Sequence, residues 1–489
     1  MPRLEDLSVG KVGFVEQYGL WSEEQQEAAQ RLQSRIEELD LRMIRVGWGD
    51  QHGIVRGKTL TVHDFLQALR NGIDFQTATL FMDTANNLFT GMFSAGGGLG
   101  MEELAGGPDS ILVPDPGTFR ALPWVPHTGW VLSDMYFQSG EPVPFDTRNV
   151  LRQVLAGLAE DGYEYVAGLE VEFYITRLED PMLRPEQSGW PPDPPRVSAL
   201  AHGFQYLTEN RNDEIDDILQ VLHEHLMTLG LPLRTMEDEW GPGQCEFTFD
   251  PALGLNAADN MLLFRTATKQ ICRRRGYHAT FMTRPALPNF FSSGWHLHQS
   301  LRTTDDDNAF TNREDDGAPI SEAGRHFVGG LLEHAHPCSV FTTPTVNGYK
   351  RFRPYSFAPD RVTWALEDRA AFIRVIGGPE DDTTHLENRA GEPCANPYLY
   401  MASQIVAGMD GIHNETDPGP LEDVPYESQR PKLPASLMDS VAALNNSKLF
   451  RDALGDRFVD YMVGLKQSEI RRFLEHVTDW EQREYFEIF

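Results

Sequence analysis

Residues 167–175 (Ala-Gly-Leu-Glu-Val-Glu-Phe-Tyr-Ile) constrain the fold more than any other segment, because their polar and apolar side chains alternate. Alternation is the period of a β-strand with one buried face, so Glu170, Glu172 and Tyr174 share one face of the expected strand. Two carboxylates held side by side repel each other unless a cation lies between them. Taken alone, a Glu-x-Glu pair indicates only a strand with a solvated polar face.

Three later segments also place polar groups on one face and apolar groups on the other. They carry Glu239 and Glu246 on either side of a Gly-Pro-Gly turn, His296 and His298 two residues apart, and Glu387 beside Arg389. A curved sheet or funnel lined by metal ligands needs segments of this kind. Five carboxylates with one or two imidazoles suit the hard ions Mg²⁺ and Mn²⁺, whereas zinc sites favour thiolates. We expect two ions, because one Mg²⁺ rarely binds so many protein carboxylates.

Eight short segments, taken in order, make the chain resemble a glutamine synthetase over almost its whole length. Each segment is weak alone, and their common order carries the resemblance. They lie at 168–173, 239–246, 279–282, 296–300, 347–351, 367–374, 386–389 and 395–399. The resemblance implies an α+β fold, in which a small N-terminal β-grasp domain precedes a large C-terminal catalytic domain with a curved antiparallel sheet.

The spacing of apolar residues and of turn residues divides the chain into parts. It predicts helices at 22–39, at 150–159 and from Leu433 onward, strands at 43–48 and 57–62, and loops at 181–195 and 305–317. Pro142 to Asp146 reads as a proline-bearing linker. We therefore expect an N-terminal helical segment at 1–40, a β-grasp domain at 41–141 and a catalytic domain at 142–489.

The family's chemistry explains why metal ligands are needed. In glutamine synthetases ATP phosphorylates the γ-carboxylate of glutamate, and an amine then displaces the phosphate to form an amide. Both steps gather negative charge in one cavity, so cations must hold the oxygens together. The resemblance implies two Mg²⁺ or Mn²⁺ ions per site, with ATP as co-substrate. It assigns Glu172, Glu239 and Glu246 to one ion and Glu170, His296 and Glu387 to the other.

The resemblance also assigns residues to the ATP side of the site. Arg351 and Arg369 are the expected catalytic residues. Arg369 and Arg374 match arginines that contact the nucleotide phosphates, because a guanidinium stabilises a transferring phosphoryl group. His298 and Ser300 match positions close to ATP.

Glutamate is expected to bind on the other side of the site. Arg351, Arg389 and Ser292 match positions that hold this substrate, and the planar fork of arginine suits its carboxylates. Two positions depart from the family pattern. Residues 291–294 read Phe-Ser-Ser-Gly in place of Asn-Gly-Ser-Gly, and His385 stands where the family commonly carries an arginine.

Two further departures fall together at the ammonia site. The family binds ammonium with an aspartate of the N-terminal domain and a glutamate of a Pro-x-x-Glu-Ala-Pro flap. Here Phe357 occupies the glutamate position, and Gln76 aligns with the aspartate, with Asp74 two residues away. Ammonium needs carboxylates to bind it and to take its proton. An aromatic-lined pocket without them favours a neutral aromatic amine such as aniline.

Composition and terminal sequence limit the partners and the compartment. The formal net charge of −31 argues against nucleic acid, whose phosphates need basic patches. We expect neither a signal peptide nor a membrane partner, because no basic region followed by a long apolar run is present. Four cysteines without a Cys-x-x-Cys pair suit a reducing cytoplasm. The resemblance implies a homo-oligomer, namely a dodecamer of two hexameric rings.

Three functions stay open at this point. The first is an ATP-dependent ligase that joins the γ-carboxylate of glutamate to an organic, aromatic amine, similar to the γ-glutamylanilide synthetases of aniline degradation. The second is an ordinary glutamine synthetase that uses ammonia. The third is a non-catalytic protein of the same fold, which the presence of all six expected metal ligands disfavours. The sequence does not specify the exact amine or the physiological metal.

Overall fold

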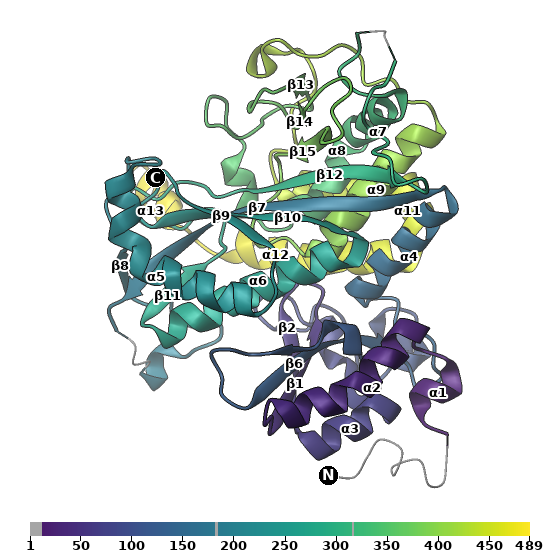
Figure 1. Cartoon of the computed structure of the whole chain (residues 1–489). Coiled ribbons are helices and arrows are strands. Elements are labelled where there is room, and N and C mark those ends of the chain that lie inside the picture. The colour runs from purple at the N-terminus through teal and green to yellow at the C-terminus, as the bar shows by residue number, and fades with distance from the viewer. Residues whose placement is uncertain (1–11, 181–183, 315–316) are drawn as a thin grey trace.

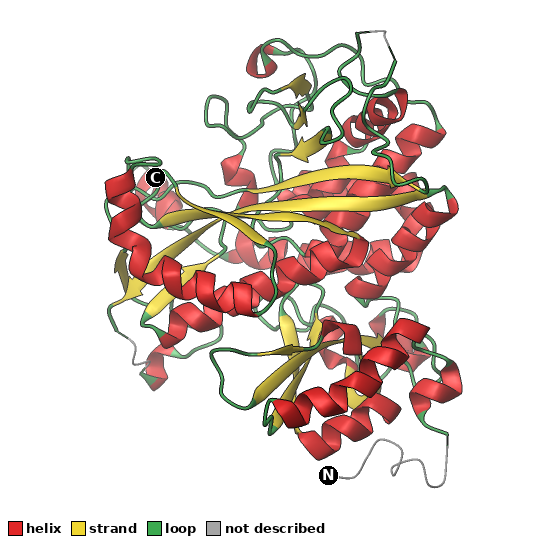
Figure 2. Ribbon diagram, in the orientation of Figure 1, coloured by secondary structure: helices red, strands yellow, loops and turns green. Residues whose placement is uncertain are grey.

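The computed structural model describes residues 12–180, 184–314 and 317–489. Residues 1–11 of the expected helical segment, 181–183 of one expected loop and 315–316 of the other lie outside these ranges. The described chain combines helices with two separate sheets, and the strands of both sheets are mostly antiparallel (Figure 1, Figure 2). The α+β prediction is therefore confirmed.

The N-terminal sheet has six strands among the described residues, in the order β2-β1-β6-β4-β3, with β5 paired to β6. The strands are β1 (Met43–Gly49), β2 (Val55–Thr61), β3 (Ile73–Gln76), β4 (Asp109–Pro114), β5 (Arg120–Ala121) and β6 (Thr128–Tyr136). The helices are α1 (Phe14–Tyr18), α2 (Glu23–Glu38) and α3 (Val62–Asn71). α2 and α3 lie in front of the sheet in Figure 1 and bury Leu32, Ile36 and Phe65 in a core that they share with Ile44 and Val46 of β1.

The start of α2 follows from its sequence. The Ser22 hydroxyl accepts a hydrogen bond from the Gln25 backbone N–H, while the Gln25 side chain accepts one from the Ser22 N–H. This capping box satisfies two N–H groups that the first turn leaves without helical partners. The helix predicted at 22–39 is confirmed, as are the strands predicted at 43–48 and 57–62.

The larger sheet has nine strands in the part of the chain that the structure describes, in the order β13-β14-β15-β12-β7-β10-β9, and β8 and β11 also pair with β7. The strands are β7 (Tyr163–Leu178), β8 (Val197–Ala199), β9 (Leu233–Asp238), β10 (Gln244–Leu253), β11 (Tyr277–Thr280), β12 (Trp295–Thr303), β13 (Trp364–Leu366), β14 (Ile373–Ile376) and β15 (His385–Asn388). All their pairings are antiparallel except that of β13 with β14. The long strands curve across the molecule in Figure 2.

The part of the chain that carries the larger sheet also contains the helices α4 (Thr147–Glu160), α5 (Glu209–Thr228), α6 (Gly254–Arg274), α7 (Glu322–Glu333), α8 (Ala335–Thr342), α9 (Pro397–His413), α10 (Leu437–Asn445), α11 (Lys448–Leu454), α12 (Asp456–Glu475) and α13 (Asp479–Tyr485). α4, α5 and α6 contact strands of the larger sheet, while α7 packs on α9 and α10 on α8 and α12. The helices predicted at 150–159 and from Leu433 onward are confirmed. Among the described residues no helix has the length and apolar character that crossing a bilayer requires.

The strand predicted at 167–175 is confirmed as the middle of β7, and its two faces differ as the alternation requires. Leu169, Val171 and Phe173 are almost fully buried, and the ring of Phe173 contacts those of Phe264 on α6 and Phe281. Burying one such side chain stabilises the fold by roughly 1.5–3 kcal/mol. This apolar face fixes the strand on α6, so the polar face with Glu170 and Glu172 lies on the opposite side of the sheet.

Residues 142–146, which we expect to link the two parts, are packed into the core. Val143 and Phe145 are fully buried, and the ring of Phe145 stacks on Tyr461 of α12 with 4.2 Å between centroids. The Tyr461 hydroxyl donates to the carbonyl oxygen of Leu80, which belongs to the N-terminal part. The two parts therefore share one continuous core.

Candidate active site

The pairing of four strands brings the expected metal ligands together. β10, β7, β12 and β15 are neighbours in the larger sheet, although their residues come from segments far apart in the sequence. Directly opposite one another lie Glu246 and Glu172, Glu170 and His296, and Glu387 and His298. We call these six residues, together with Glu239, the acidic cluster. The sheet thus gathers on one face the groups that the sequence distributes over more than two hundred residues.

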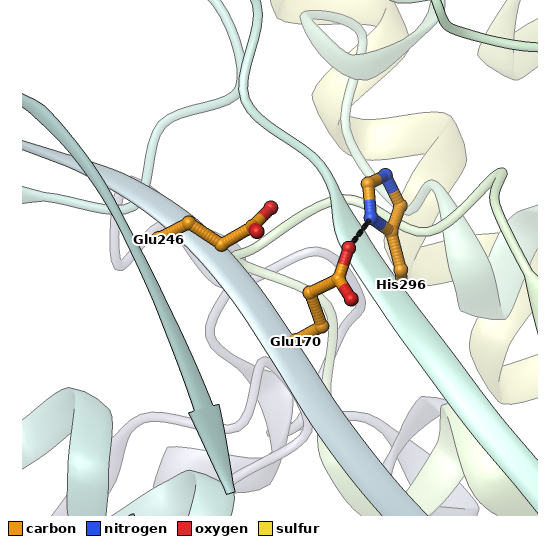
Figure 3. A group of neighbouring side chains, drawn as sticks. All are labelled: Glu170, Glu246 and His296. Atoms are coloured by element: carbon orange, nitrogen blue, oxygen red, sulfur yellow. Dashed lines mark hydrogen bonds and ion pairs between the residues drawn. The ribbon is translucent and has the colours of Figure 1, made fainter. Parts of the chain in front are cut away.

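Glu170 lies at the centre of the acidic cluster. Its Oε1 is 2.5 Å from Nδ1 of His296, and its Oε2 is 3.1 Å from Nε2 of His298. Figure 3 shows the first of these contacts, with Glu246 extending from the neighbouring strand toward the same space. Glu172 is held separately, because its Oε2 accepts hydrogen bonds from the N–H of Gly294 and from Nε2 of Gln244.

The charges of the acidic cluster are unbalanced. Burial and the carboxylates of Glu170 and Glu172 raise the pKa of Glu246 to about 11. Burial and Glu172 likewise raise the pKa of Glu239 to about 8. Burial also opposes the ionisation of Glu170, but the imidazoles of His296 and His298 outweigh it and lower the pKa of that carboxyl. A divalent cation would favour the ionised form of all these acids, and oxygen-rich donor sets of this kind fit Mg²⁺ or Mn²⁺.

The hydrogen bonds of His298 also require positive charge between this side chain and Glu170. Nδ1 of His385 lies 2.6 Å from the carbonyl oxygen of Thr383, and because a carbonyl only accepts, this nitrogen carries the proton. Nε2 of a neutral His385 then accepts from Nδ1 of His298 at 2.9 Å. The remaining nitrogen of a neutral His298 therefore directs its lone pair at the carboxylate of Glu170. Only a proton on His298 or a metal ion makes that contact favourable.

The ligand atoms are grouped differently from the expected division into two ions. Within the described chain, two sets of three ligand atoms lie within 4.8 Å of one another. One set is Glu170, Glu246 and His296, and the other is Glu170, His298 and Glu387. Glu239 accepts a hydrogen bond from the N–H of Trp240, next to it in the chain. His298, expected only near ATP, thus joins the possible ligands.

Three of the expected arginines contact the acidic cluster. Arg374 lies 3.1 Å from Glu387 and 2.6 Å from Glu367. The buried Arg351 donates to the carbonyl oxygen of Arg389 at 2.6 Å and lies 3.1 Å from Nε2 of His296. Arg389 pairs with Glu387 and donates to the carbonyl oxygens of Arg369 and Phe357. The side chain of Arg369 is exposed beside this group.

Replacing Arg389 with lysine tests the planar fork of this side chain. Arg389 makes three contacts in different directions, and an ammonium at the end of a flexible chain cannot make all three. Because hydrogen bonds to charged groups contribute roughly 1.5–3 kcal/mol, we expect kcat/KM for glutamate to fall roughly 10- to 100-fold. Steady-state kinetics with varied glutamate measure this change, and Arg325→Lys, a surface pair with Asp417, is the control. Unchanged glutamate dependence would remove Arg389 from the site.

The remaining glutamate and ATP residues lie around the same face. The Ser292 hydroxyl accepts a hydrogen bond from Arg284 at 3.0 Å, and its carbonyl oxygen accepts one from Gln244, which also contacts Glu172. Ser300 is half-buried on β12, opposite Val166 of β7. By the two-residue period it shares the face of His296 and His298, two residues beyond the latter.

The two expected amine-pocket residues occupy different parts of the chain. Phe357 lies in the loop before β13, and its carbonyl oxygen is 3.2 Å from Nη2 of Arg389. Its side chain is 64% exposed, and its φ of +57° belongs to the left-handed region, which is uncommon for a large residue and concentrates at functional sites. Gln76 ends β3 in the N-terminal sheet and is exposed. Within the described chain no hydrogen bond or ring contact joins Gln76 to Phe357.

An aromatic patch beside the acidic cluster was not anticipated from the sequence. The ring of Phe204 contacts those of Trp240 and Phe291, and Trp240 also stacks on Tyr206. All four rings are exposed, and they adjoin Glu239 and Ser292, which directly neighbour Trp240 and Phe291 in the chain. The sequence could have indicated part of this patch, because Trp240 and Phe291 are next to the expected site residues Glu239 and Ser292. Phe204 and Tyr206 lie in a separate loop that no motif marks.

Comparison with known proteins identifies the family. The family model described as glutamine synthetase, catalytic domain, matches residues 144–485. A gamma-glutamylanilide synthase of Acinetobacter sp is 45% identical over 98% of this chain and 99% of its own length, and a glutamate–isopropylamine ligase of Pseudomonas sp is 30% identical over 96% and 100%. A solved structure described as "Apo GmaS without ligand" has a TM-score of 0.78 and 26% identity over 94% of this chain and 99% of that chain. The chain therefore belongs to the glutamine synthetase family.

Proposed function

We propose that this protein is an ATP-dependent ligase that joins the γ-carboxylate of glutamate to an aromatic amine through a γ-glutamyl phosphate. The observation that carries the proposal is the arrangement of the site, in which exposed aromatic rings border an acidic cluster with arginines and Phe357 stands at the flap position. The similarity to a gamma-glutamylanilide synthase and to a glutamate–isopropylamine ligase supports the same reaction class.

The acidic cluster would hold two divalent ions, Mg²⁺ or Mn²⁺. Bound there, the ions would supply positive charge for the oxygens of ATP and of the substrate carboxylate. Arg351, Arg389 and Ser292 would bind and orient glutamate. Arg369 and Arg374 would hold the phosphates, with His298 and Ser300 near the nucleotide.

The amine would enter between Phe357 and the aromatic patch. Ammonium is charged at neutral pH and would lose water there without gaining an anionic partner. An aromatic amine is neutral, needs no carboxylate to take up a proton before it attacks, and gains roughly 0.5–1.5 kcal/mol from each ring contact beyond its burial. The site therefore favours aniline-type amines.

A matched series of amines tests the proposed function. Phosphate release would be measured with glutamate, ATP and Mg²⁺ and with aniline, an alkylamine, ammonium or no amine. We expect kcat/KM for aniline to exceed that for ammonium at least tenfold. This ratio is on the order of two effects together, namely the ring contact that ammonium cannot make and the cost of leaving one cation without a partner. Ammonium as the best substrate would instead indicate an ordinary glutamine synthetase. Phosphate release with none of the amines would favour a non-catalytic protein.

We further propose that the protein acts as a cytoplasmic homo-oligomer, a dodecamer of two hexameric rings. An assembly would account for Gln76, which is exposed in its own chain, if this side chain completed the amine site of a neighbouring subunit. Four free cysteines, three of them buried, suit a reducing compartment. Mass photometry of the purified protein tests the assembly. A monomer that retains full activity would contradict it.

A further inference from the structure

A cavity of about 550 Å³ lies where the N-terminal part meets the catalytic part. Residues 51–55 and Thr84 line it from the N-terminal part, and residues of α6, α8, α9 and α12 line it from the other. Its walls are largely apolar, with Phe281, Phe341 and Met462 among them. None of the residues of the acidic cluster lines this cavity, so it is separate from the candidate active site.

Lys466 of α12 brings an uncompensated positive charge to the cavity. Its residue is only 3% exposed, yet it lines the cavity, and its ammonium makes no hydrogen bond or ion pair within the described residues. A buried ammonium without a partner is costly, because it loses water and gains nothing in exchange. A charged side chain in this position points to a ligand that completes its environment.

Two further cations lie in the same wall. Arg265 of α6 is buried and donates to the carbonyl oxygens of Pro393, Ala395 and Gly53, so its hydrogen bonds are satisfied but its charge is not neutralised. Lys269, one turn further along α6, donates to the carbonyl oxygen of Ala279. Burial lowers the pKa of both cations, and for Arg265 it outweighs the opposing effect of the Asp50 carboxylate.

The carboxylates behind the wall are engaged elsewhere. Asp50 pairs with Arg56 at 2.6 Å, Glu392 accepts hydrogen bonds from Thr283 and Thr345, and Glu469 accepts one from the N–H of Val346. Among the described residues no aspartate or glutamate lines the cavity itself. The chain has a formal net charge of −31, yet three cations and no acidic residue surround this apolar space, which therefore favours an anionic ligand.

We propose that this cavity binds a small organic anion, whose carboxylate pairs with Lys466 and whose apolar body of about one aromatic ring contacts Phe281, Phe341 and Met462. The volume lies in the range of roughly 300–1,000 Å³ that is usual for small-molecule sites. The ligand would contact both parts of the chain, so its binding would stabilise their association. The assignment is independent of the amine that the active site uses.

Benzoate and its neutral isostere benzamide are the probes that test the site. Titration calorimetry would use the full-length enzyme in its native assembly, saturated with glutamate, Mg²⁺ and ADP so that the active site is occupied. We expect saturable benzoate binding and at least tenfold weaker benzamide binding, because a charge-assisted hydrogen bond contributes a factor of roughly ten or more. Lys466→Met keeps the length of the side chain and should weaken benzoate binding at least tenfold.

Lys448→Met is the matched control, because Lys448 is exposed on α11 and does not line the cavity. It should bind benzoate like the unchanged protein. The proposal is overturned if benzoate shows no saturable binding, if benzamide binds equally well, or if Lys466→Met leaves binding unchanged. The comparison of benzoate with benzamide needs no variant, so it decides the question even if Lys466→Met does not fold.

Discussion

Replacing Glu246 with glutamine should lower kcat by roughly 100- to 1,000-fold while the protein stays folded, an effect of the size seen when one group that stabilises transition-state charge is removed. Glu246 extends into the acidic cluster beside Glu170 and His296, where its oxygen is one of three possible ligand atoms within 4.8 Å. Glutamine keeps the shape but removes the negative charge that a divalent ion requires. Phosphate release at saturating Mg²⁺ measures the loss.

The electrostatics of the metal-free site explain why the fold should survive this change. Burial and neighbouring carboxylates raise the pKa of Glu246 to about 11, so the metal-free protein holds this side chain neutral at pH 7, and glutamine reproduces that neutral form. The metal-free variant should therefore unfold at an unchanged or higher temperature, whereas Mn²⁺ should raise its Tm less than it raises that of the unchanged protein.

A matched substitution distinguishes the loss of a metal ligand from the general effect of removing one negative charge. Glu164 lies on the same strand, β7, but it is exposed and pairs with Arg302 at the surface. Glu164→Gln should change kcat and the Mn²⁺-dependent Tm little, because exposed ion pairs contribute only about 0–1 kcal/mol. Near-normal turnover of Glu246→Gln in saturating Mg²⁺ would show that Glu246 is not a metal ligand.

Local patterns were enough to predict the elements that build the site. The alternation at 167–175 predicts β7, because only a strand separates Glu170 and Glu172 from Leu169 and Val171. The helical spacing of apolar residues at 22–39 predicts α2, whose start Ser22 and Gln25 cap through a local interaction. Such features depend on residues within one turn or one strand, which a sequence shows directly.

The pairing of the strands and the grouping of side chains could not be predicted in this way. The register that places His296 opposite Glu170 and His298 opposite Glu387 depends on contacts between segments far apart in the chain. The chain from Thr383 through His385 to His298 likewise needs three-dimensional proximity. Residues 142–146 show the same limit, because a proline indicates a break in structure but does not reveal that Phe145 stacks on Tyr461.

Changing Phe357 to glutamate should shift the preference of the enzyme from aniline toward ammonium. The substitution removes a ring contact worth roughly 0.5–1.5 kcal/mol and gives the ammonium ion an anionic partner worth roughly 1.5–3 kcal/mol. Together these effects should lower the ratio of kcat/KM for aniline to that for ammonium at least tenfold. The double variant with Gln76→Asp should shift the ratio further if Gln76 lies at the amine site as proposed, because it would add the second carboxylate with which the family binds ammonium.

The flap also offers a control for this change. Tyr355 lies in the same loop, has a φ of +58° and is 75% exposed, but its ring contacts Tyr426 with 5.1 Å between centroids. Tyr355→Glu therefore places a carboxylate in the same loop and in the same backbone conformation, two residues from the position that adjoins Arg389. Phosphate release with both amines should change much less than in Phe357→Glu. An equal shift in both variants would mean that added negative charge acts at a distance, whereas a shift in Phe357→Glu alone locates the amine beside residue 357.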